Sequence, residues 1–325
     1  AMGCRFDVVF NAGEVAEATE AGCAALDLVD EIEARISVYR SSSELAAINA
    51  AAGRWVEVTA DTLALLATAL ELGTQTGGAF DIAAGPLVRT WGFLHRQGRT
   101  PAAEELAAAL AVSGPDQLEL DPDGCRARVR LVGAELNPGG IGKGWAIDRA
   151  IDQLVANGVP SCLVHGGQSS VRAIGVQGPA LPGRSGWKVG LRHPLRPGRR
   201  LATFTLLDRA LGTSGSGTQF FVERGRRLGH ILDPRSGRPA EGVISATVLA
   251  PTAAAADALA TAAYVLGPAG LAEIVRAGPD VGAMIVLPAP GGGLRVVLAN
   301  LAAGAVSLES EPGLEVTQFE AAPET

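Results

Sequence analysis

Residues 137–156, NPGGIGKGWAIDRAIDQLVA, join a glycine-rich turn to the most regular amphipathic pattern of the chain. Its apolar residues recur at i, i+3, i+4, i+7 and i+8, which is one face of an α-helix. They are Ile147, Ala150, Ile151, Leu154 and Val155. Asn157 and Gly158 follow and supply a left-handed helix end. The stretch predicts a helix whose start offers free amides and a positive dipole end beside Lys143.

A phosphate group suits this turn, but the spacing differs from that of nucleoside triphosphatases. The Walker pattern needs Ser or Thr after its lysine, and Gly144 stands there. Triphosphate hydrolysis by that mechanism is therefore disfavoured. The local pattern is equally consistent with a plain strand-to-helix turn that carries an exposed lysine.

The flanking sequence predicts an α+β fold, with helices packed on antiparallel sheets, because helical patterns alternate irregularly with hairpin-like strands. Helices are expected over 14–39, from Thr59 to Gly73, and over 252–267. Strands are expected at 4–10, 162–164, 171–176, 187–191, 201–206, 219–223, 243–250, 281–287 and 294–298.

One domain over 1–308 is expected, with 94–126 as a peripheral excursion rich in Ala, Gly, Pro and charge. Residues 309–325 contain five glutamates with Pro and Gly, and predict a flexible acidic tail.

Composition excludes several classes of protein. The 325 residues are 47% hydrophobic and 19% charged, which argues against disordered, collagen-like and coiled-coil chains. The net charge of −7 argues against nucleic acid as a partner, because phosphate backbones bind basic surfaces. No uninterrupted apolar run approaches the ~20 residues of a membrane helix, and no signal peptide is recognised. We expect no transmembrane segment and, for the chain as it stands, a cytoplasmic location.

Two further segments carry groups that can act on a ligand. Residues 210–217, ALGTSGSG, predict a turn between strands whose Thr213 and Ser214 hydroxyls can bond phosphate or ribose oxygens; a simple hairpin turn is the plainer interpretation. His230 follows a short strand and precedes an Asp-Pro turn, so it is either a general base or a structural histidine.

Asp257 and Thr261 stand four residues apart in an alanine-rich helix and therefore share a face. A carboxylate on a buried face needs a partner or a cation. Two hard oxygen donors suit Mg2+, which completes its shell with water or phosphate. The other interpretation is that Asp257 stabilises the helix dipole in the first turn and Thr261 only fills space.

Taken in order, these segments resemble the ApbE family, the FAD:protein FMN transferases. The similarity spans nearly the whole chain before residue 309. Its matching stretches are 2–4, 37–40, 43–45 with Asn49, 78–82, 85–88, 91–93, 139–148, 166–167, 213–215, 230–237 and 257–261.

The resemblance implies a two-lobed, T-fold-like architecture with FAD bound as substrate between the lobes. It implies FAD contacts by Met2, Tyr39, Asp81, Lys143, Asp148, Thr213 and Ser214. It assigns Mg2+ to the Asp257 carboxylate, the Thr261 hydroxyl and the Gly140 carbonyl. His230 is the expected base, and Asp257 shares the catalytic role.

The implied reaction is Mg2+-dependent transfer of FMN from FAD to a Thr or Ser of an acceptor protein, with release of AMP. The favoured acceptor segment is Asp-x-x-Ser/Thr-x-Ala-Thr-like. Some relatives hydrolyse FAD to FMN and AMP instead, and an aromatic residue such as Tyr39 goes with transfer. A flavin-binding module without catalysis is a third possibility. Many relatives are anchored in the cell envelope.

Four departures from the family pattern suggest a divergent branch. Asn137-Pro138 replaces a usual Asp-Leu, and Gln168 replaces an acidic residue. Cys4 replaces Thr, and Gly229 replaces the first of two histidines. The two lost carboxylates leave metal affinity and the identity of the nucleotide open.

Overall fold

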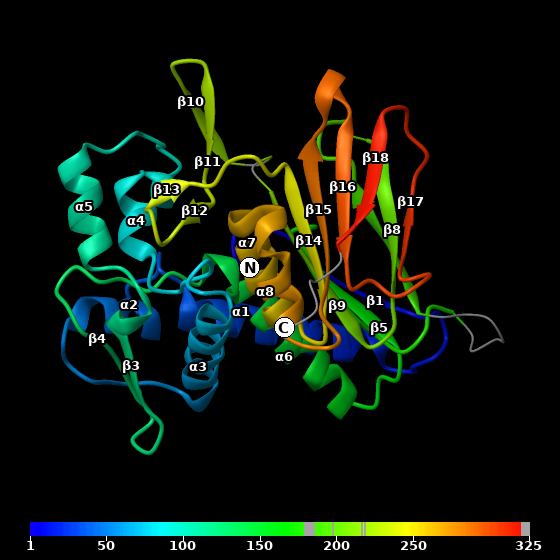
Figure 1. The fold of residues 1–325 in the computed structure, drawn as a ribbon. Helices are drawn as coiled ribbons and strands as arrows, with labels where there is room; N and C mark the ends of the chain where they lie inside the picture. Colours follow the sequence, from blue (N-terminus) through cyan, green and yellow to red (C-terminus); the bar gives the residue numbers. More distant parts are fainter. Residues whose placement is uncertain (179–185, 197, 216, 218, 320–325) are drawn as a thin grey trace.

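The computed structural model describes residues 1–178, 186–196, 198–215, 217 and 219–319. Within them, one eight-stranded sheet runs through the larger lobe (Figure 1). Its order is β1 (Phe6–Phe10), β5 (Cys162–Gly166), β6 (Ser170–Ile174), β9 (Arg209–Gly215), β14 (Ser245–Ala250), β15 (Gly282–Pro288), β16 (Leu294–Ala299) and β18 (Leu314–Gln318). Neighbouring strands are antiparallel except β16 and β18, which are parallel.

Both faces of the central strands are covered, which explains their nearly continuous apolar sequence. In β14, Val248 packs toward the helices, whereas Leu249 packs toward a second sheet. That second sheet has the order β17 (Val306–Leu308), β8 (Arg200–Leu206) and β7 (Trp187–Arg192). The main sheet is therefore the middle layer of this lobe.

Helices α1 (Ala18–Ile36), α6 (Gly142–Ala156) and α7 (Ala253–Leu266) cover the other face of the main sheet. At the crossing of α6 and α7, Gly144 lies against the carbonyl group of Ala253, where an added Cβ would stand 2.1 Å from its oxygen. Only glycine allows this approach. The crossing brings the glycine-lysine turn to the middle of α7.

The smaller lobe contains four further helices and the remaining short sheets (Figure 1). Its helices are α2 (Glu44–Ala51), α3 (Ala60–Gln75), α4 (Gly85–Thr90) and α5 (Ala103–Ala111). Its strands are β2 (Val56–Glu57), β3 (Leu118–Asp121), β4 (Arg126–Val129), β12 (Leu232–Asp233) and β13 (Arg238–Pro239), with the hairpin β10 (Phe220–Glu223) and β11 (Arg226–Gly229) beside them. The remaining short helices are α8 (Leu271–Arg276), η1 (Phe93–His95), η2 (Pro115–Gln117), η3 (Pro138–Gly140), η4 (Gly267–Gly270) and η5 (Pro290–Gly292).

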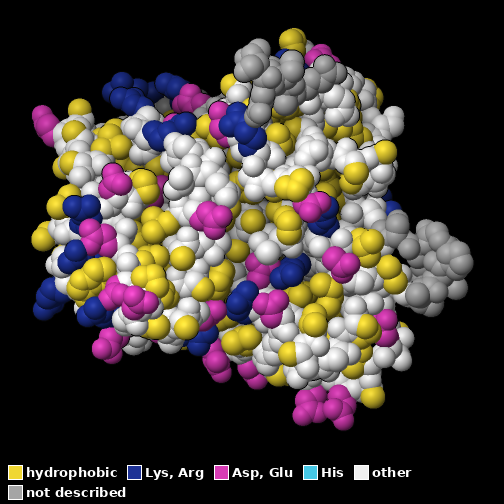
Figure 2. Space-filling view, turned by 60° about the horizontal axis from the view of Figure 1, so that its bottom comes forward, with side chains coloured by type: hydrophobic (Ala, Val, Ile, Leu, Met, Phe, Trp, Pro, Cys, Tyr) yellow, Lys and Arg dark blue, Asp and Glu magenta, His cyan; other side chains and the backbone are white. Residues whose placement is uncertain are grey.

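The predicted α+β class and the main helices are confirmed. Thr59 caps α3 as expected, because its side chain accepts a hydrogen bond from the amide of Thr62. The helix predicted from residues 147–155 lies within α6. Acidic and basic side chains are interspersed over the face shown in Figure 2.

Two expectations are wrong. Thr213 and Ser214 lie within strand β9 instead of a turn, because β9 pairs with β14 from Ala210 to Gly215. The acidic tail is anchored over part of its length: Leu314–Gln318 forms β18 on the edge of β16. Ion pairs hold the two glutamates before β18, Glu309 with Arg200 and Glu311 with Arg196. Residues 320–325 of the predicted tail lie outside the described residues.

One helical stretch of the described chain, Ala253–Arg276, is long and apolar enough to cross a membrane by length and composition alone. Within its most apolar window, 56% is buried inside the protein. Its first part, α7, packs on α6, β9 and β14, and this packing accounts for the apolar composition.

Candidate functional site

A cleft formed by two adjoining cavities lies where the turn before α6, the end of β9, α7 and the smaller lobe meet. The first cavity has a volume of about 400 Å³ and the second about 470 Å³. They share five lining residues, so we describe them as one cleft. The shared residues are Tyr39, Leu94, Asn137, Gly139 and Lys143.

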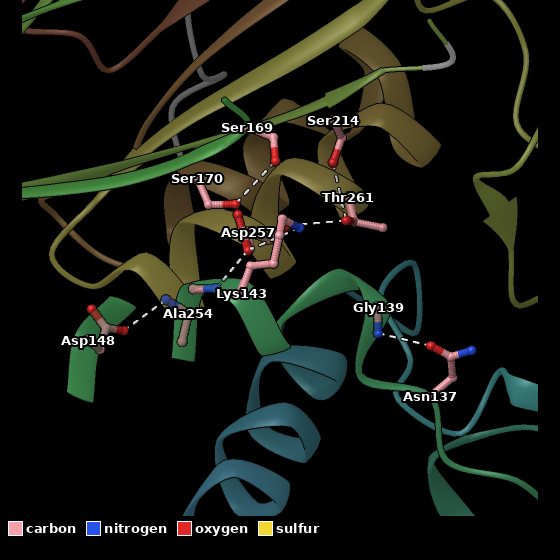
Figure 3. Close-up of polar contacts among 11 residues, drawn as sticks. Asn137, Gly139, Lys143, Asp148, Ser169, Ser170, Ser214, Ala254, Asp257 and Thr261 are labelled. Atoms are coloured by element: carbon pink, nitrogen blue, oxygen red, sulfur yellow. Dashed lines mark hydrogen bonds and ion pairs between the residues drawn. The ribbon is translucent and has the colours of Figure 1, made fainter. Parts of the chain in front are cut away.

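Asp257 is the buried carboxylate of the first cavity, and three groups hold it (Figure 3). The backbone amide of Gly144 donates to its Oδ2 at 2.9 Å, and the Ser170 hydroxyl bonds it as well. The Lys143 ammonium lies 3.8 Å from Oδ2. Burial raises the pKa of Asp257, and the charge of Lys143 partly offsets that rise. The crossing of α6 and α7 thus places one cation beside one carboxylate.

Thr261 and Gly140 add oxygen atoms next to this pair. The Thr261 hydroxyl donates to the carbonyl of Asp257 at 3.1 Å and lies 3.2 Å from the Ser214 hydroxyl. A Cβ placed on Gly140 would stand 3.3 Å from Thr261 Oγ1, so the turn passes close to the hydroxyl. No group of three or more His, Cys, Asp or Glu side chains in the described residues is arranged to hold a metal. A cation here would therefore depend on one carboxylate, hydroxyl and carbonyl oxygens, and its ligand.

His230 lines the same cavity, and its ring has a defined proton position. Its Nδ1 lies 3.0 Å from the carbonyl oxygen of Gln219. A carbonyl only accepts, so Nδ1 carries the proton and Nε2 keeps a free lone pair. Burial lowers the pKa of His230 and outweighs the bond to Gln219, which raises it; the charge of Lys143 adds to the lowering. His230 is therefore neutral at pH 7 and able to accept a proton.

The second cavity brings Met2 and Tyr39 together with Lys143. The backbone amide of Met2 donates to Glu33 Oε1 at 2.7 Å, which ties the start of the chain to α1. Tyr39 is 71% exposed, and its hydroxyl donates to the carbonyl of Leu94 at 3.2 Å. This arrangement leaves an aromatic side chain at the boundary between the two cavities.

Two other predicted residues, Asp81 and Thr213, line the first cavity. The Asp81 carboxylate accepts from the amide of Ala83 at 2.8 Å, and burial raises its pKa. The Thr213 hydroxyl lies 3.1 Å from that of Thr247. Both are placed to contact a ligand, although each already has a partner within the protein.

Asp148 is not brought into the cleft. Its buried carboxylate accepts from the amides of Ala253 and Ala254 at 2.8 and 2.9 Å and pairs with Arg172 at 2.8 Å. These are the free amides at the start of α7, so Asp148 caps that helix. Asp148 lines neither cavity, so the structure gives it a structural role at the start of α7.

Sequence reasoning missed Ser169, Ser170 and Gln219. Ser170 bonds Asp257, Ser169 lines the cleft, and Gln219 fixes the His230 ring. Their only sequence signal was proximity to the paired glycines or to His230. Common polar residues of this kind are recognised only when the fold shows what they face.

One comparison decides the family: the family model described as the ApbE family matches residues 2–285, which are most of the chain. The chain belongs to the ApbE family. The predicted resemblance is therefore confirmed, and the cleft lies within the matched region.

Named relatives within the ApbE family are similar to most of this chain. A Treponema pallidum protein named FAD:protein FMN transferase is 34% identical over 273 residues, which are 80% of this chain and 75% of the relative. A Haemophilus influenzae protein of the same name is 30% identical over 250 residues, 74% and 70% of the two chains. These similarities confirm the predicted enzyme class, a transferase.

Solved ApbE structures have the same fold. The Thermotoga maritima ApbE protein has a TM-score of 0.80 at 31% identity and covers 90% of this chain and 94% of its own. The apo form of the Pseudomonas stutzeri flavinyl transferase ApbE has a TM-score of 0.78 at 31% identity, covering 90% of both chains.

The residues that depart from the usual ApbE pattern lie in different places. Asn137 lines both cavities, and its Oδ1 accepts from the amide of Gly139 at 2.9 Å, so the amide side chain caps the turn as a carboxylate also can (Figure 3). Gln168, by contrast, has a left-handed backbone with φ of 63° and lines neither cavity. Only the change at Asn137 removes a charge from the cleft wall.

Proposed function

We propose that the protein transfers FMN from FAD to a Thr or Ser hydroxyl of an acceptor protein in a Mg2+-dependent reaction that releases AMP. One observation carries this proposal: Lys143, Asp257, Thr261, Ser214 and His230 line a single cavity although they come from distant parts of the chain. The names of the ApbE relatives supply the substrate class.

The donor set fits Mg2+. Asp257, Thr261 and the backbone at Gly140 offer hard oxygens, and the buried carboxylate of Asp257 gains most from a cation because burial disfavours its charge. When bound, Mg2+ supplies positive charge to the diphosphate of FAD. We assign the ion to these three residues.

The side chains divide the remaining work. Lys143 offsets negative charge on the diphosphate, and Ser214 donates a hydrogen bond to it. The acceptor hydroxyl oxygen forms a bond to the FMN phosphorus as the bond from that phosphorus to the bridging oxygen breaks. AMP leaves with the bridging oxygen. His230 Nε2 accepts the proton of the hydroxyl, since its lone pair is free at pH 7.

The flavin fits the second cavity. Met2 and Tyr39 offer apolar and aromatic surface there, and Lys143 lies where the two cavities meet. A dinucleotide that spans both cavities thus places its diphosphate beside Lys143 and Asp257.

Hydrolysis of FAD is the second candidate, with water in place of the acceptor hydroxyl. The cleft is open enough for water, so geometry alone allows both reactions. We favour transfer because Tyr39, the aromatic residue that accompanies transfer in the family, stands at the boundary of the cavities.

The test is incubation of the protein with FAD, Mg2+ and a peptide that contains Asp-x-x-Thr-x-Ala-Thr. AMP together with a fluorescent, covalently labelled peptide supports transfer. AMP with free FMN supports hydrolysis, and bound but intact FAD supports a binding module. A peptide with Val in place of both Thr residues is the matched control and must remain unlabelled.

A further inference from the structure

The hairpin β10–β11 projects from the rest of the molecule (Figure 1). Gln219 directly precedes β10, His230 directly follows β11, and both line the cleft. Phe220 pairs with Gly229 across the hairpin, so the base of the hairpin is one residue away from His230.

The turn of the hairpin defines which backbone groups point outward. Arg224 and Gly225 both have positive φ, 48° and 77°, as in a two-residue type I′ turn. In such a hairpin the pair next to the turn, Glu223 with Arg226, is hydrogen-bonded, and hydrogen-bonded pairs alternate with non-bonded ones. The amides and carbonyls of Phe220 and Val222 therefore point away from β11.

This outer edge of β10 is unpaired within the described residues, where no backbone hydrogen bond reaches Phe220 or Val222 from outside the hairpin. Their side chains are 43% and 63% exposed. Phe221 between them faces inward and packs on Trp91 and Phe93, at 6.3 and 5.8 Å between ring centroids. The edge is thus open but held firmly against the smaller lobe.

The hairpin is basic although the protein is acidic. Residues 220–229, FFVERGRRLG, contain three arginines and one glutamate, whereas the whole chain has a net charge of −7. Glu223 bonds the Thr100 hydroxyl, and Arg226 pairs with Glu241. Arg224 is exposed at the turn. Charge complementarity favours an acidic partner.

We propose that an extended, acidic segment of the acceptor protein binds the outer edge of β10 as an added strand. Main-chain hydrogen bonds to Phe220 and Val222 give such strand addition its affinity. Strands rise about 3.3 Å per residue, so the residue one or two positions beyond the partner of Phe220 reaches the level of Gln219 and His230. The hydroxyl-bearing residue takes that position. This inference rests on the proposed function.

The test compares labelling of the Asp-x-x-Thr-x-Ala-Thr peptide by the wild type and by Val222→Pro. Proline removes the outward N–H of Val222 and leaves the hairpin's own hydrogen-bonded pairs in place. We expect the KM for the peptide to rise roughly fivefold to tenfold, the value of one hydrogen bond. Val222→Thr retains the N–H and is expected to keep the wild-type KM. FAD affinity and the melting temperature show whether the cleft and the fold survive.

A second variant, Arg224→Glu, reverses charge at an exposed position and is expected to raise the KM for the acidic peptide about threefold or more at low salt. If Val222→Pro loses FAD binding, Arg224→Glu decides alone. If Val222→Pro binds FAD normally, a wild-type KM for the peptide in this variant overturns the added strand. If Val222→Pro does not bind FAD, a wild-type KM in Arg224→Glu overturns it. Failure of the wild type to label the peptide overturns the proposed function, and this inference with it.

Discussion

Replacing Asp257 by Asn removes a charge from the cleft with little change of shape. Burial raises the pKa of Asp257 above its ordinary value of 3.8 even beside Lys143. The group therefore favours folding below pH 3.8, and that contribution is lost as the pH rises through the raised pKa. Asn carries no such penalty, so at pH 7 we expect Asp257→Asn to be at least as stable as the wild type.

The turnover of Asp257→Asn is expected to fall, although its stability is not. The substitution removes the one carboxylate assigned to Mg2+, and loss of such a stabilising group lowers turnover on the order of 10²–10³-fold. Asp257→Ala provides the contrast, because it leaves the amide of Gly144 without the acceptor it now has at 2.9 Å. An unpaired buried amide costs about 1–3 kcal/mol, or roughly 2–6 °C in melting temperature for a chain of this length.

The assay is AMP release from FAD with Mg2+ and the acceptor peptide, measured with thermal unfolding at pH 7 for all three proteins. The expected pattern is low turnover in both variants but a lower melting temperature only in Asp257→Ala. Wild-type turnover in Asp257→Asn would refute the metal assignment. A melting temperature several degrees below the wild type in Asp257→Asn would refute the argument about its buried charge.

Three other substitutions test parts of the structure. His230→Gln should lower turnover by about 10²–10⁴-fold. In the wild type the lowered pKa of His230 places the acid limb of the pH–rate profile below pH 6.5. His230→Gln should abolish this limb, and a limb that persists argues for another base. Gly144→Ala forces a Cβ against the Ala253 carbonyl and should reduce the free energy of unfolding by about 3 kcal/mol or more in urea titrations. Asp148→Ala leaves Arg172 and the first amides of α7 without their acceptor and should cost about 3–5 kcal/mol by the same measurement; wild-type stability in either variant would contradict the packing described.

Local patterns predicted the fold where one face of an element is buried. The spacing of apolar residues gave α6, and Thr59 marked the start of α3. Helix α5 was missed because its cap is unusual: the Glu105 side chain accepts from the amide of Ala102, where no Ser, Thr, Asp or Asn signals a start.

The tail prediction failed because charge pattern alone does not show where partners lie. In the sequence Glu309 and Glu311 look like solvated charges, yet they pair with Arg200 and Arg196, more than 100 residues earlier. Only the fold brings these groups together.

The site shows the same limit. Spacing placed Asp257 and Thr261 on one helix face, but nothing local showed that this face meets Gly144, 113 residues earlier. The family resemblance implied that Asp257 and Thr261 lie near Gly140, but it did not include the bond to the Gly144 amide. The sequence did not show that Asp148 caps α7, because a carboxylate near a ligand-binding turn has the same local pattern in either role.

The crossing of α6 and α7 has a consequence for biosynthesis. A nascent chain that has left the ribosome as far as His230 holds the base and the lysine, but neither the carboxylate of Asp257 nor the helix that closes against Gly144. The cleft is completed only when Thr261 has emerged, because Thr261 is the last described residue of the chain that lines it. A nascent chain that ends before Asp257 therefore lacks the carboxylate that lies beside Lys143.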